Sequence, residues 1–144
     1  MPGENPAELP NCGTSQPLRY DRRVSLAPFE VQSEELAEGI RILTVRGELD
    51  MNTAPQLEKK LEEVSSENAL IMVDLSECEF IDSTGIALIV RAWQRIDREA
   101  GKGRGRFILR CGNHQVRRLL KLTGVESTIS MHEERDAALA ELRG

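Results

Sequence analysis

The chain has 144 residues, of which 40% are hydrophobic and 30% charged, and its formal net charge is −5. This length is enough for one domain whose buried core needs no disulfide bridges. The acidic balance and an aromatic content of only 3% argue against a nucleic-acid-binding protein, because such proteins present basic surfaces to phosphates and exposed rings to bases.

Residues 1–26 differ from the rest of the chain. Proline, glycine, asparagine and serine recur through them, and no apolar periodicity of two or 3.6 residues persists. We therefore predict a flexible N-terminal tail at 1–26 and one folded domain at 27–144. No apolar run approaches a membrane span, and the first residues lack the basic and apolar regions of a signal peptide. We expect a cytoplasmic protein that does not bind membranes.

The predicted domain opens with a hairpin and a helix. Residues 30–36 and 40–47 are expected to pair as antiparallel strands, with Gly39 in the turn. Thr53 is the expected N-cap of the next helix, and Gln56 would complete a capping box. The apolar residues on one face of this helix are Leu57, Leu61 and Val64.

A buried strand and a long helix follow. The continuous apolar run at 69–73 is typical of a strand covered on both faces. After a connector, Asp82 or Ser83 begins the helix. Its inward stripe is expected to consist of Ile86, Ile89, Val90, Trp93 and Ile96. With this helical phase, Leu88 lies on the outer face.

The last part of the chain continues the alternation of strands and helices. We predict a fourth strand at 106–111 and a third helix between an Asn113 cap and Gly124. A short last strand at 127–131 and a closing helix at 133–142 complete the domain. This alternation after an opening hairpin predicts an α/β fold with a mixed sheet of four to five strands and about four helices.

The start of the long helix is the strongest candidate site. The free amide groups and the dipole of a helix N-terminus favour negative charge. A phosphate on Ser83 would therefore be held by the amides of the first turn. The plainer alternative, that Asp82 or Ser83 only caps the helix, is the commoner case in proteins. Gly85 in the first turn lets another backbone come close.

A second polar segment ends the strand before the first helix. Asp50 in this segment either accepts hydrogen bonds that stabilise the turn or belongs to a functional site. If its strand neighbours the strand before Asp82, then Asp50, Asp82 and Ser83 converge at one end of the sheet, without a basic centre. Leu88, little more than one turn after Ser83, would be an apolar docking spot there, although single exposed leucines are common.

Enzymatic alternatives lack the residues they need. A serine hydrolase needs a histidine base, and neither His114 nor His132 follows a strand in the way that would aim it at Ser83. The GKGRG segment at 101–105 lies between a helix and a strand, the reverse of a phosphate-binding loop. The odd set of cysteines, Cys12, Cys78 and Cys111, has no CxxC spacing and indicates free thiols. We predict no catalysis, no cofactor and no metal site.

Three motifs resemble a known family. GELDxxTA at 47–54 and DLSECEFIDSTGI at 74–86, with RRLLKLTG at 117–124, are similar to the STAS domain of bacterial anti-sigma factor antagonists. The resemblance covers roughly residues 28–143. It implies a mixed sheet with helices packed mainly on one side.

The resemblance also implies a function. In that family the unphosphorylated protein binds an anti-sigma factor that is also a serine kinase of the histidine-kinase-like ATPase type, which frees the sigma factor. The kinase phosphorylates the serine that corresponds to Ser83, and a metal-dependent phosphatase reverses the reaction. Asp50 and Asp82 correspond to acidic positions beside that serine. The expected partner-binding residues are Asp50, Asp82, Ser83, Thr84, Gly85 and Leu88.

Two other functions stay open from the sequence. STAS domains also serve in stress-signalling or lipid-transport complexes, as structural or small-ligand-binding modules. A phosphorylation assay with candidate kinases would separate that role from an antagonist. A small nucleotide-binding or hydrolytic domain would instead show turnover of ATP or GTP.

Overall fold

The computed structural model describes residues 28–65, 69–98 and 106–144. The predicted tail at 1–26 and the GKGRG segment at 101–105 lie outside these ranges. No helix in the described part of the chain is long and apolar enough to cross a membrane.

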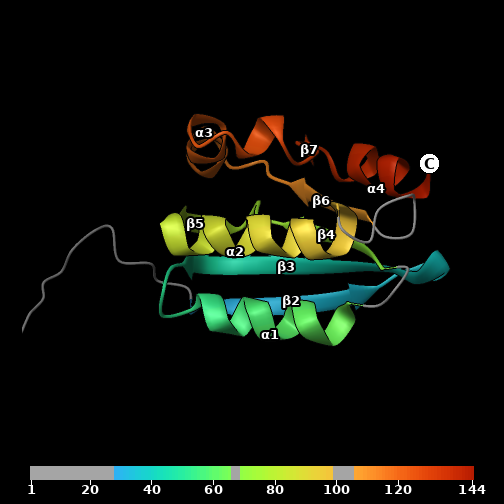
Figure 1. Cartoon of the computed structure of the whole chain (residues 1–144), viewed down its shortest axis with the longest axis horizontal. Coiled ribbons are helices and arrows are strands. Elements are labelled where there is room, and N and C mark those ends of the chain that lie inside the picture. The colour runs from blue at the N-terminus through green and yellow to red at the C-terminus, as the bar shows by residue number, and fades with distance from the viewer. Residues whose placement is uncertain (1–27, 66–68, 99–105) are drawn as a thin grey trace, which may run out of the picture.

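Within the described ranges, six strands form one mixed sheet (Figure 1). In chain order they are β2 (Glu30–Glu35), β3 (Ile40–Leu49), β4 (Leu70–Asp74), β5 (Cys78–Ile81), β6 (Arg106–Arg110) and β7 (Met131–His132). The sheet order is β2-β3-β4-β6-β7, and only the β2–β3 pair is antiparallel. Strand β5 pairs in parallel with the last residues of β3, beyond the part of β3 that pairs with β4.

The hairpin, the buried strand and the strand that begins at residue 106 are confirmed. Gly39 has φ +77° in the hairpin turn, a conformation that glycine adopts without strain. Strand β5 lies where the sequence indicated only a connector. The last strand was predicted at 127–131, but β7 is Met131–His132, so the two share only Met131. Ser127 instead ends the 3-10 helix η3 (Val125–Ser127).

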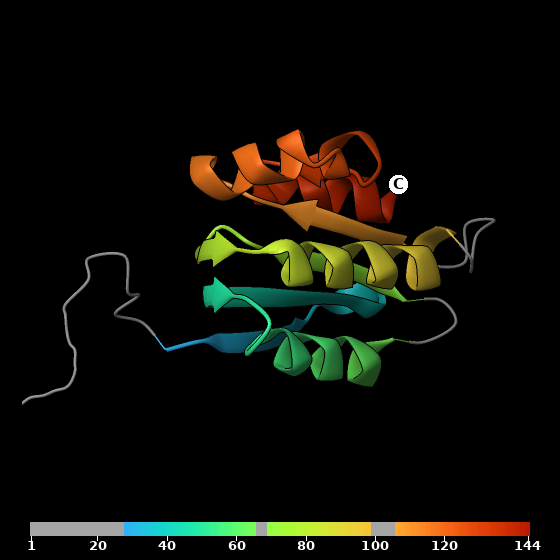
Figure 2. The same ribbon diagram turned by 60° about the vertical axis from the view of Figure 1, so that its left-hand side comes forward.

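Four α-helices accompany the sheet in the described part of the chain: α1 (Ala54–Val64), α2 (Ser83–Trp93), α3 (His114–Leu122) and α4 (Arg135–Arg143). Figure 2 shows α1 and α2 side by side over the same face of the sheet. Helix α3 adds Val116 and Leu120 to the core on that face, whereas α4 packs on the opposite face. The helices therefore lie mainly on one side, as expected.

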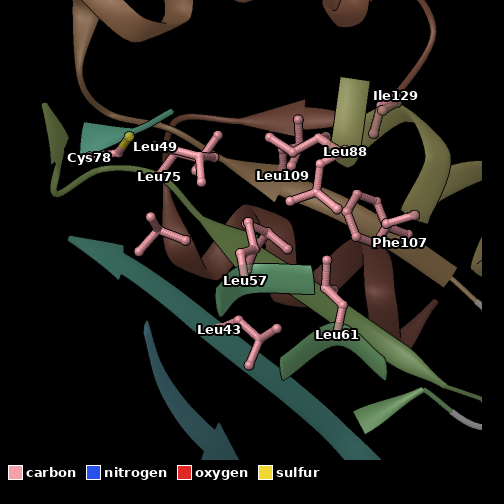
Figure 3. Packing of buried hydrophobic residues seen from close by; sticks show 14 of the residues in the cluster. Leu43, Leu49, Leu57, Leu61, Leu75, Cys78, Leu88, Phe107, Leu109 and Ile129 are labelled. Atoms are coloured by element: carbon pink, nitrogen blue, oxygen red, sulfur yellow. The ribbon is translucent and has the colours of Figure 1, made fainter. Parts of the chain in front are cut away.

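The alternation of side chains along β3 divides the apolar residues between two cores. Leu43, Val45 and Leu49 face the main core under α1, α2 and α3, part of which Figure 3 shows. Ile40 and Ile42 point to the other face. The residues that complete this smaller core are Met72, Ile108, Ala138, Leu139 and Leu142.

The predicted phase of α2 is wrong by about one residue. The residues of α2 that are buried are Gly85, Leu88, Ile89 and Ala92. Leu88, expected on the outer face, is only 4% exposed and packs in the main core (Figure 3). The small residues Gly85 and Ala92 are part of the buried face. A helical phase assigned from the large apolar residues alone leaves them out and is therefore rotated. Of the predicted stripe, Ile89 and Ile96 are buried as expected, whereas Ile86, Val90 and Trp93 are only half-buried at the edge of this core.

The caps of α3 are as predicted. The Asn113 Oδ1 atom accepts hydrogen bonds from the amides of Gln115 and Val116, at 2.9 and 3.2 Å. Gly124 has φ +83° just after the helix, which suits the residue that ends it. Local sequence signals therefore placed both ends of this helix.

Candidate functional site

The ends of β3 and β5 bring the two predicted polar segments together. Leu49 and Ile81 are register partners at the ends of these parallel strands. The amide of Asp82 donates to the carbonyl of Leu49 at 3.1 Å. Asp50 and Asp82, the next residue of each segment, therefore lie at the same end of the sheet, and Ser83 begins α2 beside them.

Asp82 is the residue that caps α2. Its backbone is extended, and its Oδ1 atom accepts the amide hydrogen of Gly85 at 3.0 Å. Its carbonyl accepts the first helical hydrogen bond, from the amide of Ile86. Ser83 and Thr84 are exposed in the first turn. The Asp82 carboxylate is thus the N-cap of α2, and Ser83 is free to expose its hydroxyl at the surface.

Gly85 seats this helix start tightly against the strand ends. A Cβ atom at Gly85 would lie 2.8 Å from Cγ of Leu49 and 3.0 Å from Cγ1 of Ile81. Carbon atoms do not approach this closely without a shift of the neighbours. The close approach expected at Gly85 exists, but it is made by side chains and not by another backbone.

The loop after β3 is held by hydrogen bonds among its own residues. Asp50 Oδ1 accepts the amides of Asn52 and Thr53 at 2.9 and 3.1 Å. The Thr53 hydroxyl donates to the carbonyl of Glu48 at 2.7 Å, and its oxygen accepts the amide of Asp50 at 2.9 Å. The predicted capping box is wrong, because the Thr53 hydroxyl bonds to this loop and not to α1.

Two exposed apolar side chains border the site and were missed from the sequence. Met51, in the middle of the loop, is 69% exposed. Phe80, on β5, is 45% exposed, whereas its neighbours Cys78 and Ile81 turn into the core. Strict alternation would place Phe80 on the same face as the buried Cys78. The register shifts between Gly47, which pairs with Cys78, and Glu48, which pairs with Phe80, so alternation along the sequence did not indicate the exposure of Phe80.

Carboxylates dominate the surroundings of Ser83. Glu48 is the register partner of Phe80, and Glu79 is exposed beside it. Together with Asp50 and Asp82 they make this end of the sheet acidic. Nothing in the described ranges groups three or more His, Cys, Asp or Glu residues in a way that could hold a metal ion. The arrangement offers an accessible hydroxyl to another protein's chemistry.

The cysteine beneath the site is structural. Cys78 is free and buried, and its Sγ atom donates to the carbonyl of Phe80 at 3.2 Å. Burial raises the pKa of the Cys78 thiol to about 11. A thiol that stays protonated at neutral pH is a poor nucleophile. Cys111 is likewise free and buried, while Cys12 lies outside the described residues.

Comparisons with known proteins agree on one family. The STAS domain model matches residues 33–138. The anti-sigma-F factor antagonist RsfB of Mycobacterium tuberculosis is 28% identical over 107 residues, which are 74% of this chain and 84% of that protein.

Solved structures of anti-sigma factor antagonists share the fold of this chain. The crystal structure of an anti-sigma factor antagonist from Mycobacterium paratuberculosis superposes with a TM-score of 0.71 at 28% identity. It covers 81% of this chain and 96% of that one. The phosphorylated form of the Bacillus cell fate determinant SpoIIAA shares the fold, with a TM-score of 0.59 at 22% identity over 79% of this chain and all of its own.

Proposed function

The chain belongs to the STAS domain family, and we propose that it is an anti-sigma factor antagonist switched by phosphorylation of Ser83. In this proposal the unphosphorylated form binds an anti-sigma factor and thereby frees a sigma factor. The relatives named as antagonists support the assignment. The observation that carries it is the exposed Ser83 hydroxyl at the start of α2, between the Asp82 cap and the Asp50 loop.

The partner and its chemistry follow from what the site lacks. Ser83 supplies a hydroxyl, and its neighbours Asp82 and Thr84 and the loop at residues 50–53 contain no histidine, lysine or arginine. The catalytic groups for phosphorylation must therefore come from another protein. We propose that the anti-sigma factor is itself a serine kinase of the histidine-kinase-like ATPase type, and that a metal-dependent phosphatase removes the phosphate.

The Asp82 cap changes how a phosphate on Ser83 would sit. Because Asp82 Oδ1 already takes the amide of Gly85, the phosphate and this carboxylate compete for the same helix N-terminus. Phosphorylation adds about −1.5 to −2 charges next to Asp82 and Asp50. We expect the phosphate to turn outward, toward the partner, and not to be absorbed by the first turn of α2.

An outward phosphate is sufficient for a switch. A partner surface that covers the neutral hydroxyl would have to strip water from a dianion, and burying an ion costs several kcal/mol. A change of about 5.5 kcal/mol in differential affinity moves a two-state equilibrium from almost fully bound to almost fully free. The cost of burying the phosphate is therefore similar in size to the change in binding free energy that a switch needs.

The remaining predicted contact residues take different roles in this proposal. Asp82, Ser83 and Thr84 would face the partner directly, and Asp50 would hold the neighbouring loop. Gly85 is buried, so it acts by seating α2. Leu88 is removed from the surface, because it belongs to the main core.

The test measures phosphorylation and binding on matched variants. Peptide mass spectrometry after incubation with the purified anti-sigma factor and ATP should place the phosphate on Ser83. Ser83→Ala should abolish phosphorylation and bind constitutively, while Ser83→Asp should weaken binding at least tenfold. Ser33→Ala, at an exposed serine on β2 outside the proposed contact residues, is the control and should behave as the wild type. A phosphate on another residue, or equal binding by both Ser83 variants, would contradict the proposed switch.

A further inference from the structure

We infer that Met51 and Phe80 are the two apolar anchors of the surface that receives the partner of Ser83, and that they fit a protein surface with apolar pockets and a basic rim. This inference rests on the proposed function, because it names contacts of the same site. It is carried by the exposure of the two side chains, by the elements that hold them and by the charges around them.

The position of Met51 is fixed by its loop. Asp50 and Thr53 bind the backbone on both sides of Met51, through the hydrogen bonds that tie residues 48–53 together. This loop presents the Met51 side chain to solvent, with 69% of it exposed. A long apolar side chain on a loop that is already ordered loses little further backbone entropy on binding.

Phe80 is unusual among the aromatic residues of this chain. Of the three phenylalanines, Phe107 is fully buried and Phe29 is half-buried against the main core. Phe80 alone is largely exposed, at 45%. It stands on β5, three residues before Ser83, so the strand that holds it also leads into the modified turn.

The two side chains lie where an interface would need them. The large exposed apolar residues of the described chain are Met51, Phe80 and Leu122. Met51 directly follows Asp50, and Phe80 precedes Asp82 by two positions, at the strand ends that the register pairs together. Methionine and aromatic residues are enriched at the centre of interfaces, and a few such anchors supply most of the binding energy.

The charges around the anchors define the occupant. Glu48 and Glu79 flank Phe80, and Asp50 and Asp82 lie beside Met51 and Ser83. Arg46 lines one pocket with Glu79, but its own ion pair is with Glu77, at 2.7 Å. A partner that buries the anchors must face these carboxylates at the rim, so its own rim carries Lys or Arg. A second copy of this chain does not fit, because it would bring the same acidic end against this one.

This placement also explains how one phosphate can oppose binding to a basic partner. Ser83 follows Phe80 by three residues and begins α2 beside the loop that holds Met51. A partner that covers both anchors would therefore also cover Ser83, where a dianion would lose its water. The rim carboxylates stay partly solvated and act mainly on the rate of association. Apolar contact at the centre then supplies the affinity that phosphorylation removes.

The experiment titrates alanine variants against the purified histidine-kinase-like anti-sigma factors of the organism that encodes this chain. Met51→Ala and Phe80→Ala should each raise the Kd of the unphosphorylated protein at least tenfold. Leu122→Ala removes an equally exposed apolar side chain from the end of α3, and should change the Kd less than twofold. Urea denaturation of the same proteins should show midpoints close to the wild type, which separates lost contacts from lost folding.

A second set of measurements, on salt dependence and charge variants, tests whether the rim of the partner is basic. The association rate should fall as salt rises from about 0.05 to about 0.5 M, because screening weakens steering. Glu79→Gln should lower the rate at low salt and flatten this dependence. An association rate that increases when Glu79 is replaced by Lys would overturn the basic rim.

The outcomes separate this inference from the proposed function. If the wild type binds an anti-sigma factor and Ser83→Asp weakens it, while Met51→Ala and Phe80→Ala bind as the wild type does, only the anchors are overturned. If the wild type binds none of the anti-sigma factors, both proposals fail. A loss of affinity in Leu122→Ala equal to that in the anchor variants would also overturn the inference, because it would show no preference for this end of the molecule.

Discussion

The four residues of the Asp82–Gly85 turn divide between building the helix start and presenting a surface. Asp82 accepts the amide of Gly85, and Gly85 allows α2 to lie against the side chains of Leu49 and Ile81. Ser83 and Thr84 are exposed between them. An acidic residue, a hydroxyl pair and a glycine are therefore needed here for separate physical reasons.

Replacing Gly85 with alanine tests the seating of α2. Alanine favours a helix interior by about 1 kcal/mol over glycine, but its Cβ would lie 2.8 Å from Leu49 Cγ. We expect Gly85→Ala to lower the free energy of unfolding by about 1–3 kcal/mol, the usual range for overpacking. Urea denaturation measures this, with Thr84→Ala as an exposed control that should stay within about 0.5 kcal/mol. If Gly85→Ala is as stable as the wild type or more stable, α2 can move away from Leu49 and Ile81 at little cost.

At the scale of elements, α2 is positioned by the small residues on its buried face. Gly85, Leu88 and Ala92 lie on that face. Gly85 lets the start of the helix lie close to the sheet, and Leu88 packs in the main core. Helix α4 is attached differently. Its apolar residues pack against Ile40 and Ile42 in the smaller core. Its Glu141 side chain contacts Arg106 on β6 and His132 on β7.

Truncation of Leu88 tests the corrected phase of α2. A leucine that is 4% exposed in the main core should cost about 2–5 kcal/mol of unfolding free energy when it is replaced by alanine. Ile86→Ala, at a half-buried position of the same helix, should cost clearly less. Chemical denaturation of both variants shows which of them loses more unfolding free energy. Equal losses, or a larger loss at Ile86, would restore the phase predicted from the large apolar residues.

The pH dependence of α4 docking follows from Glu141. Burial would raise the pKa of this carboxyl, but hydrogen bonds from His132 and Ser130 and the charge of Arg106 outweigh it and hold the pKa below its ordinary value. A lowered pKa gives stability that is present above the unfolded value of about 4.3 and is lost as pH falls through the folded pKa.

We therefore expect Glu141→Gln to destabilise the protein at neutral pH, and the difference from the wild type to shrink as pH falls below about 4. Thermal denaturation across pH measures the difference. Glu62→Gln, an exposed position on α1, is the control and should show little change at either pH. A destabilisation of Glu141→Gln that is constant with pH would mean that packing, and not charge, holds this contact.

At the scale of the whole molecule, the functional end and the stabilising cores are separate. The acidic end with Ser83 lies beyond the strand ends of β3 and β5, while the two cores lie on the faces of the sheet. Changes at the exposed site should therefore alter binding more than stability. This separation is what lets binding and folding be measured independently on one variant.

Removal of residues 1–26 tests the predicted domain boundary. Pro28 and Phe29 pack over Gly47, where an added Cβ would lie 3.0 Å from Cα of Phe29, and the deletion leaves both in place. Because residues 1–26 carry no periodic apolar face, we expect the melting temperature to change by less than about 5 °C. Affinity for the anti-sigma factor should be unchanged. A larger fall in melting temperature would place part of this segment in the folded core.

The sequence by itself determined the features that depend on neighbouring residues. The hairpin turn at Gly39, the start of α2 at Asp82 or Ser83 and the Asn113 cap each rest on contacts within a few positions. The motifs around Asp50 and Ser83 also fixed the family. These signals are short-range, because turns and caps are chosen by local backbone geometry and local hydrogen bonds.

Only the tertiary structure decided which side chains are covered. Leu88 is buried because it packs in the main core with residues of other elements, and Met51 and Phe80 remain exposed in the described chain. The Thr53 hydroxyl bonds to Glu48 instead of α1, because the return of the chain from β3 brings that carbonyl within 2.7 Å. Burial depends on elements distant in sequence, and the choice of acceptor for Thr53 depends on the path of the backbone after β3. Periodicity within one helix or strand carries neither kind of information.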